Sequence, residues 1–213
     1  MLDSTILLHI CNRDRPTELA LLLQSLRTQT YKNFNILILD DGSTTPIQNY
    51  YFLTYIINKM KQEGHDIIII RNNVCSGVSK ARQQLIDHSL KNRDEQYYCR
   101  IDDDSILESD YLEKFTHVIK AGYDVASGLV PALNNINITR NVDYVTPIIG
   151  YCQLNDKGEL IANFDDCAFL YNKQVILPSP HFRSCALFKR EIFENGVDYN
   201  SRLSKNGFRE EQV

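Results

Sequence analysis

The chain has 213 residues, 43% of them hydrophobic and 23% charged, a balance that is typical of a folded globular protein and argues against disorder. Its 23 basic and 27 acidic residues give a formal net charge of −4, and no run of lysine and arginine occurs, which argues against nucleic acid as a partner. At this length the chain can bury a sizeable core, and we expect one α/β domain.

Cysteine spacing and the opening residues indicate the cellular compartment. The six cysteines are far apart and form no C-x-x-C pair, which predicts reduced thiols rather than a disulfide framework or a zinc site. The first residues lack a basic stretch followed by an apolar one, and no apolar run approaches the length that spans a membrane. We therefore expect a soluble cytoplasmic protein.

The first 122 residues alternate between β-rich apolar runs and segments with helical periodicity. Strands are expected at residues 5–10, 34–39, 67–70 and 97–101, and helices at 16–30, 46–64, from residue 78 and from a cap at Ser109. In the first helix, leucines recur at i, i+3, i+4 and i+7 between residues 19 and 26, one apolar stripe. This alternation predicts a Rossmann-like, mostly parallel sheet with helices on both faces.

Two of the expected strands end in acidic residues. Asp40-Asp41-Gly42-Ser43 follows the second strand, and Asp102-Asp103-Asp104 follows the fourth. Because ligands of such sheets bind beyond the carboxyl ends of the strands, we expect one shared site there. In extended backbone, residues two apart point to the same side, so Asp102 and Asp104 are expected to converge while Asp103 points away.

The aspartate triplet allows two interpretations. Convergent carboxylates suit Mg²⁺ or Mn²⁺, whose coordination shell the phosphates of a substrate would complete. Alternatively, the triplet is an acidic loop that caps the next helix. A similar choice applies to Lys80 and Arg82, which stand in the first turns of a helix, where its dipole disfavours cations. Either they face a phosphate or a base, or they are solvated surface side chains.

Beyond Gly122 the pattern changes to short β-rich segments. Strands are expected at residues 124–129, 142–154, 160–164, 168–176 and 184–188, with a hairpin turn at 155–158 and a helix at 189–195 that ends at Gly196. This half of the sheet is predicted to be antiparallel or mixed.

Taken in order, these segments resemble the inverting GT-A glycosyltransferases of family 2. The segments that carry the resemblance are the opening strand with Arg15-Pro16, residues 29–43, Gly77-Val78-Ser79-Lys80-Ala81-Arg82, the triplet as a D-x-D element, residues 186–191, and Glu210-Glu211. Their order along nearly the whole chain argues against chance similarity. The length and ending also resemble the amino-terminal catalytic domain of a larger, chlorovirus-type glycan-building transferase, with further domains following.

The resemblance implies a GT-A fold in a single domain over residues 1–213, with a nucleotide-binding half at 1–122 and a donor-sugar and acceptor half at 123–213. The implied activity is Mn²⁺- or Mg²⁺-dependent transfer of a hexose-type sugar from a UDP-sugar to a hydroxyl of a glycan or glycoconjugate. Asp41 would accept a hydrogen bond from uracil N3 and Asp40 would support its loop. Asp102 would lie near the ribose and the metal, Asp103 would orient donor hydroxyls, and Asp104 would ligate the metal.

Further residues are implied in the same way. The other nucleotide-binding residues are His9, Cys11, Asn12, Arg13, Lys80 and Arg82. Glu211, or in second place Glu210, would be the general base, although the family usually has aspartate there, which leaves the choice open. Cys11 stands where some members have an aromatic residue that stacks on uracil, so stacking is weak here or comes from elsewhere. His181 is either an additional metal ligand or a surface loop residue.

Other functional classes fit the sequence less well. A sugar-phosphate nucleotidylyltransferase would have a glycine-rich loop after the first strand, and residues 11–14 contain no glycine. A dinucleotide dehydrogenase would need a G-x-G-x-x-G element after a strand, which is absent. The alternatives are therefore a non-catalytic nucleotide-sugar-binding module of a larger enzyme and, despite the missing glycines, a sugar-phosphate nucleotidylyltransferase.

Overall fold

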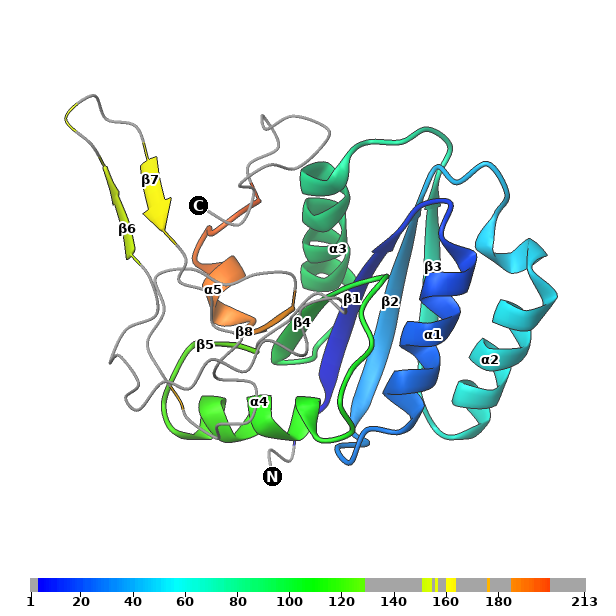
Figure 1. Ribbon diagram of the computed structural model, residues 1–213, viewed down its shortest axis with the longest axis horizontal. Helices are drawn as coiled ribbons and strands as arrows, with labels where there is room; N and C mark the ends of the chain where they lie inside the picture. Colours follow the sequence, from blue (N-terminus) through cyan, green and yellow to red (C-terminus); the bar gives the residue numbers. More distant parts are fainter. Residues whose placement is uncertain are drawn as a thin grey trace, which may run out of the picture.

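The computed structural model describes residues 4–128, 151–154, 156, 160–163, 176 and 185–199 (Figure 1). The strands of this part are β1 (Ile6–Asn12), β2 (Phe34–Asp41), β3 (Ile67–Asn72), β4 (Tyr97–Asp102), β5 (Val125–Ser127), β6 (Tyr151–Leu154), β7 (Leu160–Asn163) and β8 (Ala186–Lys189). Its helices are α1 (Pro16–Arg27), α2 (Tyr51–Gln62), α3 (Val78–Asn92), α4 (Tyr111–Lys120) and α5 (Glu191–Glu194), with a short 3₁₀ helix at Ile47–Asn49.

Six strands form one mixed sheet in the order β3-β2-β1-β4-β8-β5. β1 pairs in parallel with both β2 and β4, and β2 pairs in parallel with β3. β8 enters between β4 and β5 and is antiparallel to both. β6 and β7 form a separate antiparallel hairpin. The predicted parallel first half and mixed second half are therefore confirmed for the described residues.

Alternate residues of the central strands are buried on opposite faces of the sheet. In β1, Ile6 and Leu8 join the core under α1, α2 and α4, whereas Leu7 joins the core under α3 and α5. The four leucines of the predicted α1 stripe are fully buried in the first of these cores. Because both faces of the sheet are covered, its central strands read as continuous apolar runs. Figure 1 shows α1, α2 and α4 on one face and α3 on the other, as predicted.

Several boundaries differ from the sequence-based expectation. The single helix expected over residues 46–64 is divided into a 3₁₀ turn and α2, because Tyr50 is extended, with ψ of 108°. Its half-buried ring packs against the core, and its carbonyl accepts the first bond of α2 from the Thr54 N–H. The cap of α4 is Asp110 rather than Ser109. The strands expected at 142–150 and 168–175 lie outside the described residues.

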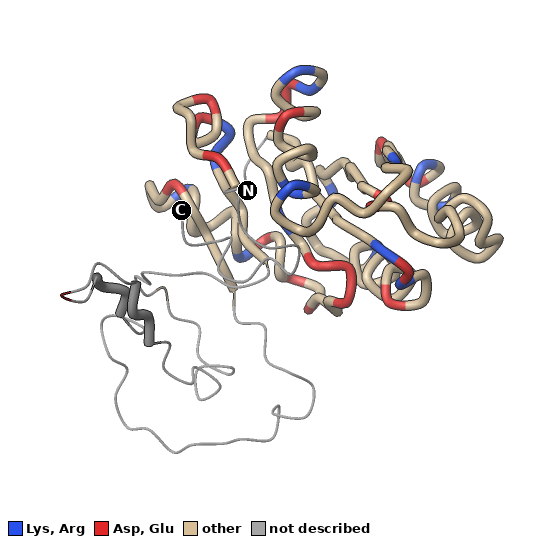
Figure 2. The backbone as a smooth tube through the Cα atoms, turned by 90° about the horizontal axis from the view of Figure 1, so that it is seen from above, with Lys and Arg blue, Asp and Glu red and all other residues tan. Residues whose placement is uncertain are grey.

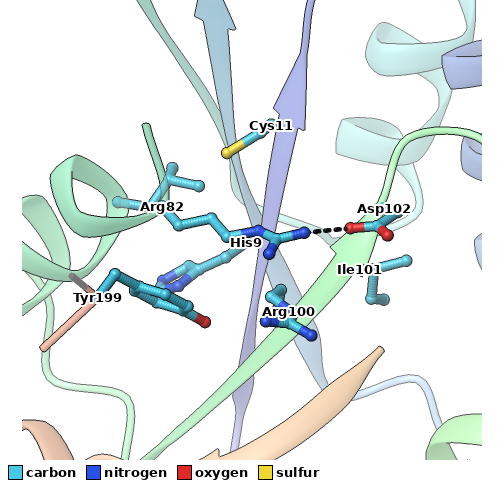
Figure 3. A pocket seen from close by; sticks show the side chains of 8 residues that line it. His9, Cys11, Arg82, Arg100, Ile101, Asp102 and Tyr199 are labelled. Carbon is cyan, nitrogen blue, oxygen red and sulfur yellow. Dashed lines mark hydrogen bonds and ion pairs between the residues drawn. The ribbon is translucent and has the colours of Figure 1, made fainter. Parts of the chain in front are cut away.

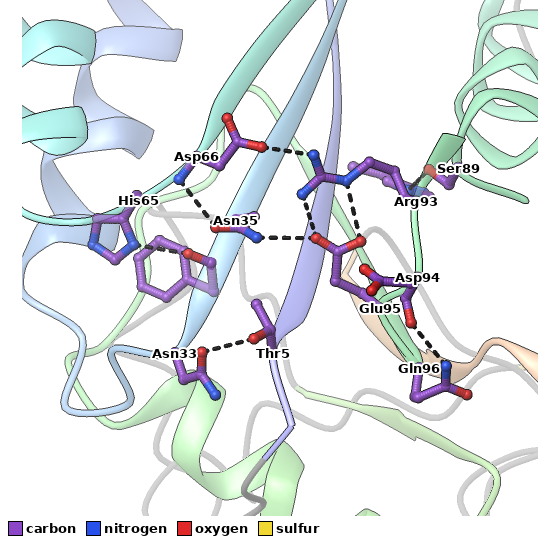
Figure 4. Close-up of polar contacts among 12 residues, drawn as sticks. Thr5, Asn33, Asn35, His65, Asp66, Ser89, Arg93, Asp94, Glu95 and Gln96 are labelled. Atoms are coloured by element: carbon purple, nitrogen blue, oxygen red, sulfur yellow. Dashed lines mark hydrogen bonds and ion pairs between the residues drawn. The ribbon is translucent and has the colours of Figure 1, made fainter. Parts of the chain in front are cut away.

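The amino-terminal edge of the sheet has a closed polar network (Figure 4). Arg93 pairs with Asp66, at 2.6 Å, and with the buried Glu95. Asn35 links the same groups, donating to Glu95 at 3.0 Å and accepting from the Asp66 N–H. Because the described partners already satisfy these charges, the network fastens the strand ends together and leaves the opposite edge as the candidate site.

Charge, thiols and hydropathy of the described residues add three facts. Acidic and basic residues alternate in short stretches along the backbone (Figure 2). The cysteines whose side chains are described carry free thiols, of which Cys99 and Cys185 are buried and Cys11 and Cys75 half-buried. No helix in this part of the chain combines the length and the apolar character that crossing a membrane requires.

Candidate functional site

The carboxyl ends of β1, β2 and β4 meet at one edge of the sheet. In register, Asn12 of β1 lies beside Asp40 of β2, and Cys11 of β1 lies beside Asp102 of β4. The loops that follow β1 and β2 are connected, because the Asp14 N–H donates to Ser43 Oγ at 3.0 Å. The two acidic strand ends therefore share one edge, as expected from the sequence.

Asp40 organises the loop that follows β2. Its fully buried carboxylate accepts from the Ser43 N–H at 3.0 Å and from the Ile47 N–H at 3.3 Å. The guanidinium of Arg71, at the end of β3, forms an ion pair with Asp40 and also donates to the Ser43 carbonyl at 2.7 Å. These contacts connect Asp40 to the loop that follows β2 and to the end of β3.

Asp41 pins the loop between β3 and α3. One carboxylate oxygen accepts from Asn72 Nδ2 at 2.8 Å, Ser76 Oγ at 2.8 Å and the Ser76 N–H at 2.9 Å. The other accepts from the Gly77 N–H at 3.0 Å and from the Cys75 thiol at 3.4 Å. Burial alone would raise the pKa of Asp41, but these hydrogen bonds outweigh it and hold the pKa below its ordinary value.

These contacts bear on the expected hydrogen bond between Asp41 and uracil. An ionised carboxylate has about four lone-pair sites, and donors of this loop already use that capacity. A uracil N3–H would therefore share an oxygen with a loop donor or replace the long contact from Cys75. In the described structure, Asp41 holds the loop that leads into α3 in its shape.

The first aspartate of the triplet faces α3. Arg82, itself 8% exposed, reaches from the second turn of α3 to Asp102 Oδ1 at 2.9 Å (Figure 3). Lys80, two residues earlier, is exposed and forms no ion pair with the described residues. Of the two helix cations left open by the sequence, the structure thus brings Arg82 to the site.

The other two aspartates face the start of α1. Asp103 is 6% exposed and accepts from Asn12 Nδ2 at 2.7 Å. Arg15 Nη1 lies 3.2 Å from Asp103 Oδ1 and 2.8 Å from Asp104 Oδ2. Burial raises the pKa of Asp103 to about 6, although Arg15 and Asn12 oppose this shift.

The expectation that Asp103 points away while Asp102 and Asp104 converge is wrong. β4 ends at Asp102, and the next two residues form a turn, so the two-residue alternation of a strand does not extend to Asp104. The ion pairs group the three aspartates differently. Asp102 pairs with Arg82, whereas Asp103 and Asp104 both pair with Arg15. Asp103 is the most buried carboxylate of the three.

A small pocket opens beside Asp102 on the α3 face of the sheet (Figure 3). The side chains that line it are His9, Cys11, Arg82, Leu85, Arg100, Ile101, Asp102 and Tyr199. Burial lowers the pKa of His9 to about 3 and raises that of the Cys11 thiol to about 12, so both groups are neutral at pH 7. Charge in the lining therefore comes from Arg82, Arg100 and Asp102.

The carboxylate oxygens of the triplet suit a hard divalent cation whose coordination shell a substrate would complete. Among the described residues, no group of three or more histidine, cysteine, aspartate or glutamate side chains is arranged to hold an ion alone. Carboxylate oxygens suit Mg²⁺ and Mn²⁺, which are commonly held by one or two carboxylates together with substrate phosphates. Asp104, with 53% of its side chain exposed, is open to such a substrate.

Three side chains that contact the acidic strand ends were not predicted from the sequence, and three predicted site residues lie outside the described residues. Arg15, Arg71 and Asn72 each bind one of the acidic strand ends. Arg15 could have been found from its position, three residues after the end of β1 and directly ahead of the proline that starts α1. Arg13 is exposed and lies 3.8 Å from Asp14, its only described ion-pair partner. The other candidates, His181, Glu210 and Glu211, lie outside the described residues.

Sequence comparison connects the chain to known enzymes. The family model described as glycosyl transferase family 2 matches residues 5–196. Glycosyltransferase GlyA of Streptococcus pneumoniae is 31% identical over 107 residues, which cover 50% of this chain and 14% of that protein. The Escherichia coli UDP-Glc:alpha-D-GlcNAc-diphosphoundecaprenol beta-1,3-glucosyltransferase WfaP is 38% identical over 82 residues, 38% of this chain and 28% of that protein. The matched segments thus span less than a third of either relative.

Solved structures show the same fold. S. aureus TarS 1-349 superimposes with a TM-score of 0.63 at 16% identity, covering 98% of this chain and 53% of that chain. The mannosyltransferase PcManGT from Pyrobaculum calidifontis, in complex with GDP-Man and Mn²⁺, gives a TM-score of 0.58 at 11% identity, covering 97% and 50%. TarS has also been solved with UDP and with UDP-GlcNAc. The predicted GT-A fold is therefore confirmed, and the chain spans about half of these structures.

Proposed function

Because the chain belongs to glycosyltransferase family 2 and is a glycosyltransferase, we propose that it moves a hexose from a UDP-sugar to a hydroxyl of a glycan or glycoconjugate, with inversion and with Mn²⁺ or Mg²⁺. The observation that carries this activity is the meeting of Asp41, Asp102 and Asp104 at one sheet edge, on loops held by hydrogen bonds and ion pairs. The UDP and UDP-GlcNAc complexes of TarS support the uridine donor.

The residues at this edge would divide the work of binding the donor. Asp41 keeps the loop before α3 in shape, so that this loop and the end of β1 can enclose the base. Asp102, paired with Arg82, would lie at the ribose, and Arg82 would add positive charge near the diphosphate. Cys11 is neutral and too small to stack on a base, so binding of the base would depend on hydrogen bonds and on the loop backbone.

The reaction requires one displacement and one proton transfer. The acceptor oxygen forms a bond to the anomeric carbon while the bond from that carbon to the diphosphate breaks, and the configuration inverts because no covalent intermediate forms. A divalent cation, when bound, supplies positive charge to the leaving diphosphate. We assign Glu211 as the general base that removes the proton of the acceptor hydroxyl, with Glu210 as the second candidate. We assign Asp104 to the side of the site where the diphosphate binds.

Other parts of the activity stay predictions. They include the role of His181, the division into a nucleotide half and an acceptor half at residue 122, further domains after residue 213 and the cytoplasmic location. The chain matches only part of the length of its relatives, so acceptor recognition by the whole protein also stays a prediction. The PcManGT complex with GDP-Man makes guanosine the first alternative to uridine in any donor test.

A screen of nucleotide sugars for donor hydrolysis tests this function without an acceptor. We expect Mn²⁺-dependent release of UDP from one UDP-hexose, and a fall of about 100-fold in Asp104→Asn, because removal of one charge that holds the cation weakens leaving-group stabilisation. Asp94→Asn is the matched control, since Asp94 is exposed at the opposite edge of the sheet. Its turnover should equal that of the wild type.

Two outcomes would count against parts of this assignment. Unchanged turnover in Asp104→Asn, or full turnover in EDTA, would contradict the role of the triplet in metal binding. Neither result would contradict glycosyl transfer itself. Calorimetry with UDP and with GDP separates the remaining alternative. Tight binding of UDP with neither hydrolysis nor transfer from any donor would indicate a nucleotide-sugar-binding module.

A further inference from the structure

Arg15 bridges two members of the aspartate triplet. Its Nη1 lies 2.8 Å from Asp104 Oδ2 and 3.2 Å from Asp103 Oδ1. The environment of Arg15 is uneven, because Asp103 is buried whereas half of the Arg15 and Asp104 side chains is exposed. One end of the bridge is therefore fixed by Asn12, and the other end faces solvent.

The backbone of Arg15 is fixed by hydrogen bonds, whereas half of its side chain is exposed. Arg15 is the N-cap residue of α1, and its carbonyl accepts from the Leu19 N–H at 3.1 Å and from Asn12 Nδ2 at 3.1 Å. A cation at a helix N-terminus is disfavoured by the helix dipole, so the carboxylates must compensate for its presence. The charge of Asp103, reinforced by that of Asp104, raises the pKa of Arg15 above its ordinary value.

The bridge occupies Oδ2 of Asp104, an oxygen that a divalent cation bound to this carboxylate could use. A guanidinium and a divalent cation repel each other, and Asp104 Oδ2 cannot serve both at hydrogen-bonding and coordination distance. We propose that Arg15 is an internal counter-ion that neutralises Asp104 when no nucleotide is bound and withdraws onto Asp103 when Asp104 takes up the cation. This role rests on the metal site proposed above.

Two consequences follow for cation binding. Arg15 lowers the affinity of the nucleotide-free protein for free Mn²⁺, because a bound ion must compete with a charge that is already in place. The negative diphosphate of the donor offsets this repulsion, so the cation and the nucleotide bind together. Arg15 is thus a positioning residue, which acts on the site through Asp103 and Asp104.

The test measures Mn²⁺ binding to the nucleotide-free protein by electron paramagnetic resonance of the free ion. Removal of one positive charge about 4 Å from a divalent ion near the surface should tighten Mn²⁺ binding about tenfold in Arg15→Gln. Arg15→Lys keeps the charge and should stay close to the wild type. Arg27→Gln is the matched control, because Arg27 belongs to the last turn of the same helix and pairs with Glu63.

A double variant locates the ion. Arg15→Gln combined with Asp104→Asn should lose the gain in affinity, whereas a retained gain places the ion elsewhere and overturns the proposal. Equal Mn²⁺ affinity in Arg15→Gln and in the wild type overturns it, as does the absence of Mn²⁺ binding from every variant. Donor hydrolysis in EDTA, measured in parallel, shows whether glycosyl transfer survives such a failure. Thermal unfolding of each variant verifies that the exposed substitution leaves the fold intact.

Discussion

Buried ionisable side chains next to the site differ in the direction in which their surroundings shift the pKa. Asp41 and Asp103 are both nearly buried, yet their pKa values move in opposite directions. Asp41 receives backbone and side-chain hydrogen bonds that favour its ionised form, whereas Arg15 and Asn12 only partly offset the burial of Asp103. Equal exposure therefore does not imply equal protonation, and the donors around each carboxylate decide.

His9 is a third case, because its ring is held neutral. It is 4% exposed, its Nε2 lies 2.8 Å from Ser89 Oγ, and burial lowers its pKa to about 3. An unfolded histidine has a pKa of about 6.5, so the unfolded chain binds the proton first as the pH falls. The contribution of His9 to stability is complete above about pH 6.5 and declines as the pH falls from there toward 3.

Because the pKa of His9 is lowered on folding, the stability of the protein should fall as the pH falls below about 6.5. Between pH 7 and pH 5, the wild type should lose about 2 kcal/mol of unfolding free energy through His9 alone, a loss that His9→Gln should not show. Urea unfolding at a series of pH values measures the difference. His117→Gln, at an exposed position of α4, should keep the wild-type dependence. Parallel curves for the wild type and His9→Gln would contradict the neutral, buried assignment.

At the scale of elements, the loops after β2 and β3 depend on a close backbone contact at Gly42. Its φ is +73°, and a Cβ at this position would lie 2.6 Å from the Cys75 N and 2.7 Å from the Val74 carbonyl carbon. Both atoms belong to the backbone of the loop that Asp41 pins, so neither can turn aside as a flexible side chain would. A side chain at position 42 must therefore push the two loops apart.

Gly42→Ala should destabilise the protein by about 3 kcal/mol or more, because a backbone clash adds to the strain of a positive φ. Gly64→Ala is the control, since φ is +101° there but nothing lies within 4 Å of the added Cβ. That change should cost only about 1 kcal/mol. Chemical unfolding measures both values, and calorimetry with UDP should show weaker binding for Gly42→Ala alone. Equal destabilisation by the two changes would exclude the clash as the cause.

The elements themselves were predictable where one physical signal dominated. Continuous apolar runs predicted β1 to β4, and the leucine stripe predicted α1, because burial on one or both faces leaves a direct trace in residue order. Tyr50 was missed as the break before α2, since its extended backbone is set by packing against the core and not by proline or glycine. The site was predictable to the level of strand ends, whereas the pairing of Arg15 with Asp103 and Asp104 depends on where β4 stops.

At the scale of the whole molecule, one sheet joins segments that are distant in sequence. β8 forms its ladder with β4 through Tyr98 and Phe188 and with β5 through Val125 and Phe188. Arg190, directly after β8, donates to the carbonyls of Leu90 and Arg93 at the end of α3. The strand that carries the triplet is thus supported on one side by β1 and on the other by residues near position 187.

This topology predicts that residues 1–128 do not fold without β8. In that fragment β4 would become an edge strand, Tyr98 and Cys99, which are fully buried in the whole chain, would lose cover, and β5 would lose its partner in the sheet. Unpaired strand edges with apolar side chains favour aggregation over a cooperative monomer. We expect the fragment to bind a hydrophobic dye and to lack a sharp thermal transition, in contrast to the 213-residue chain. A cooperative transition in the fragment would instead show that β1 to β4 and their helices form an independent folding unit, with β8 added afterwards.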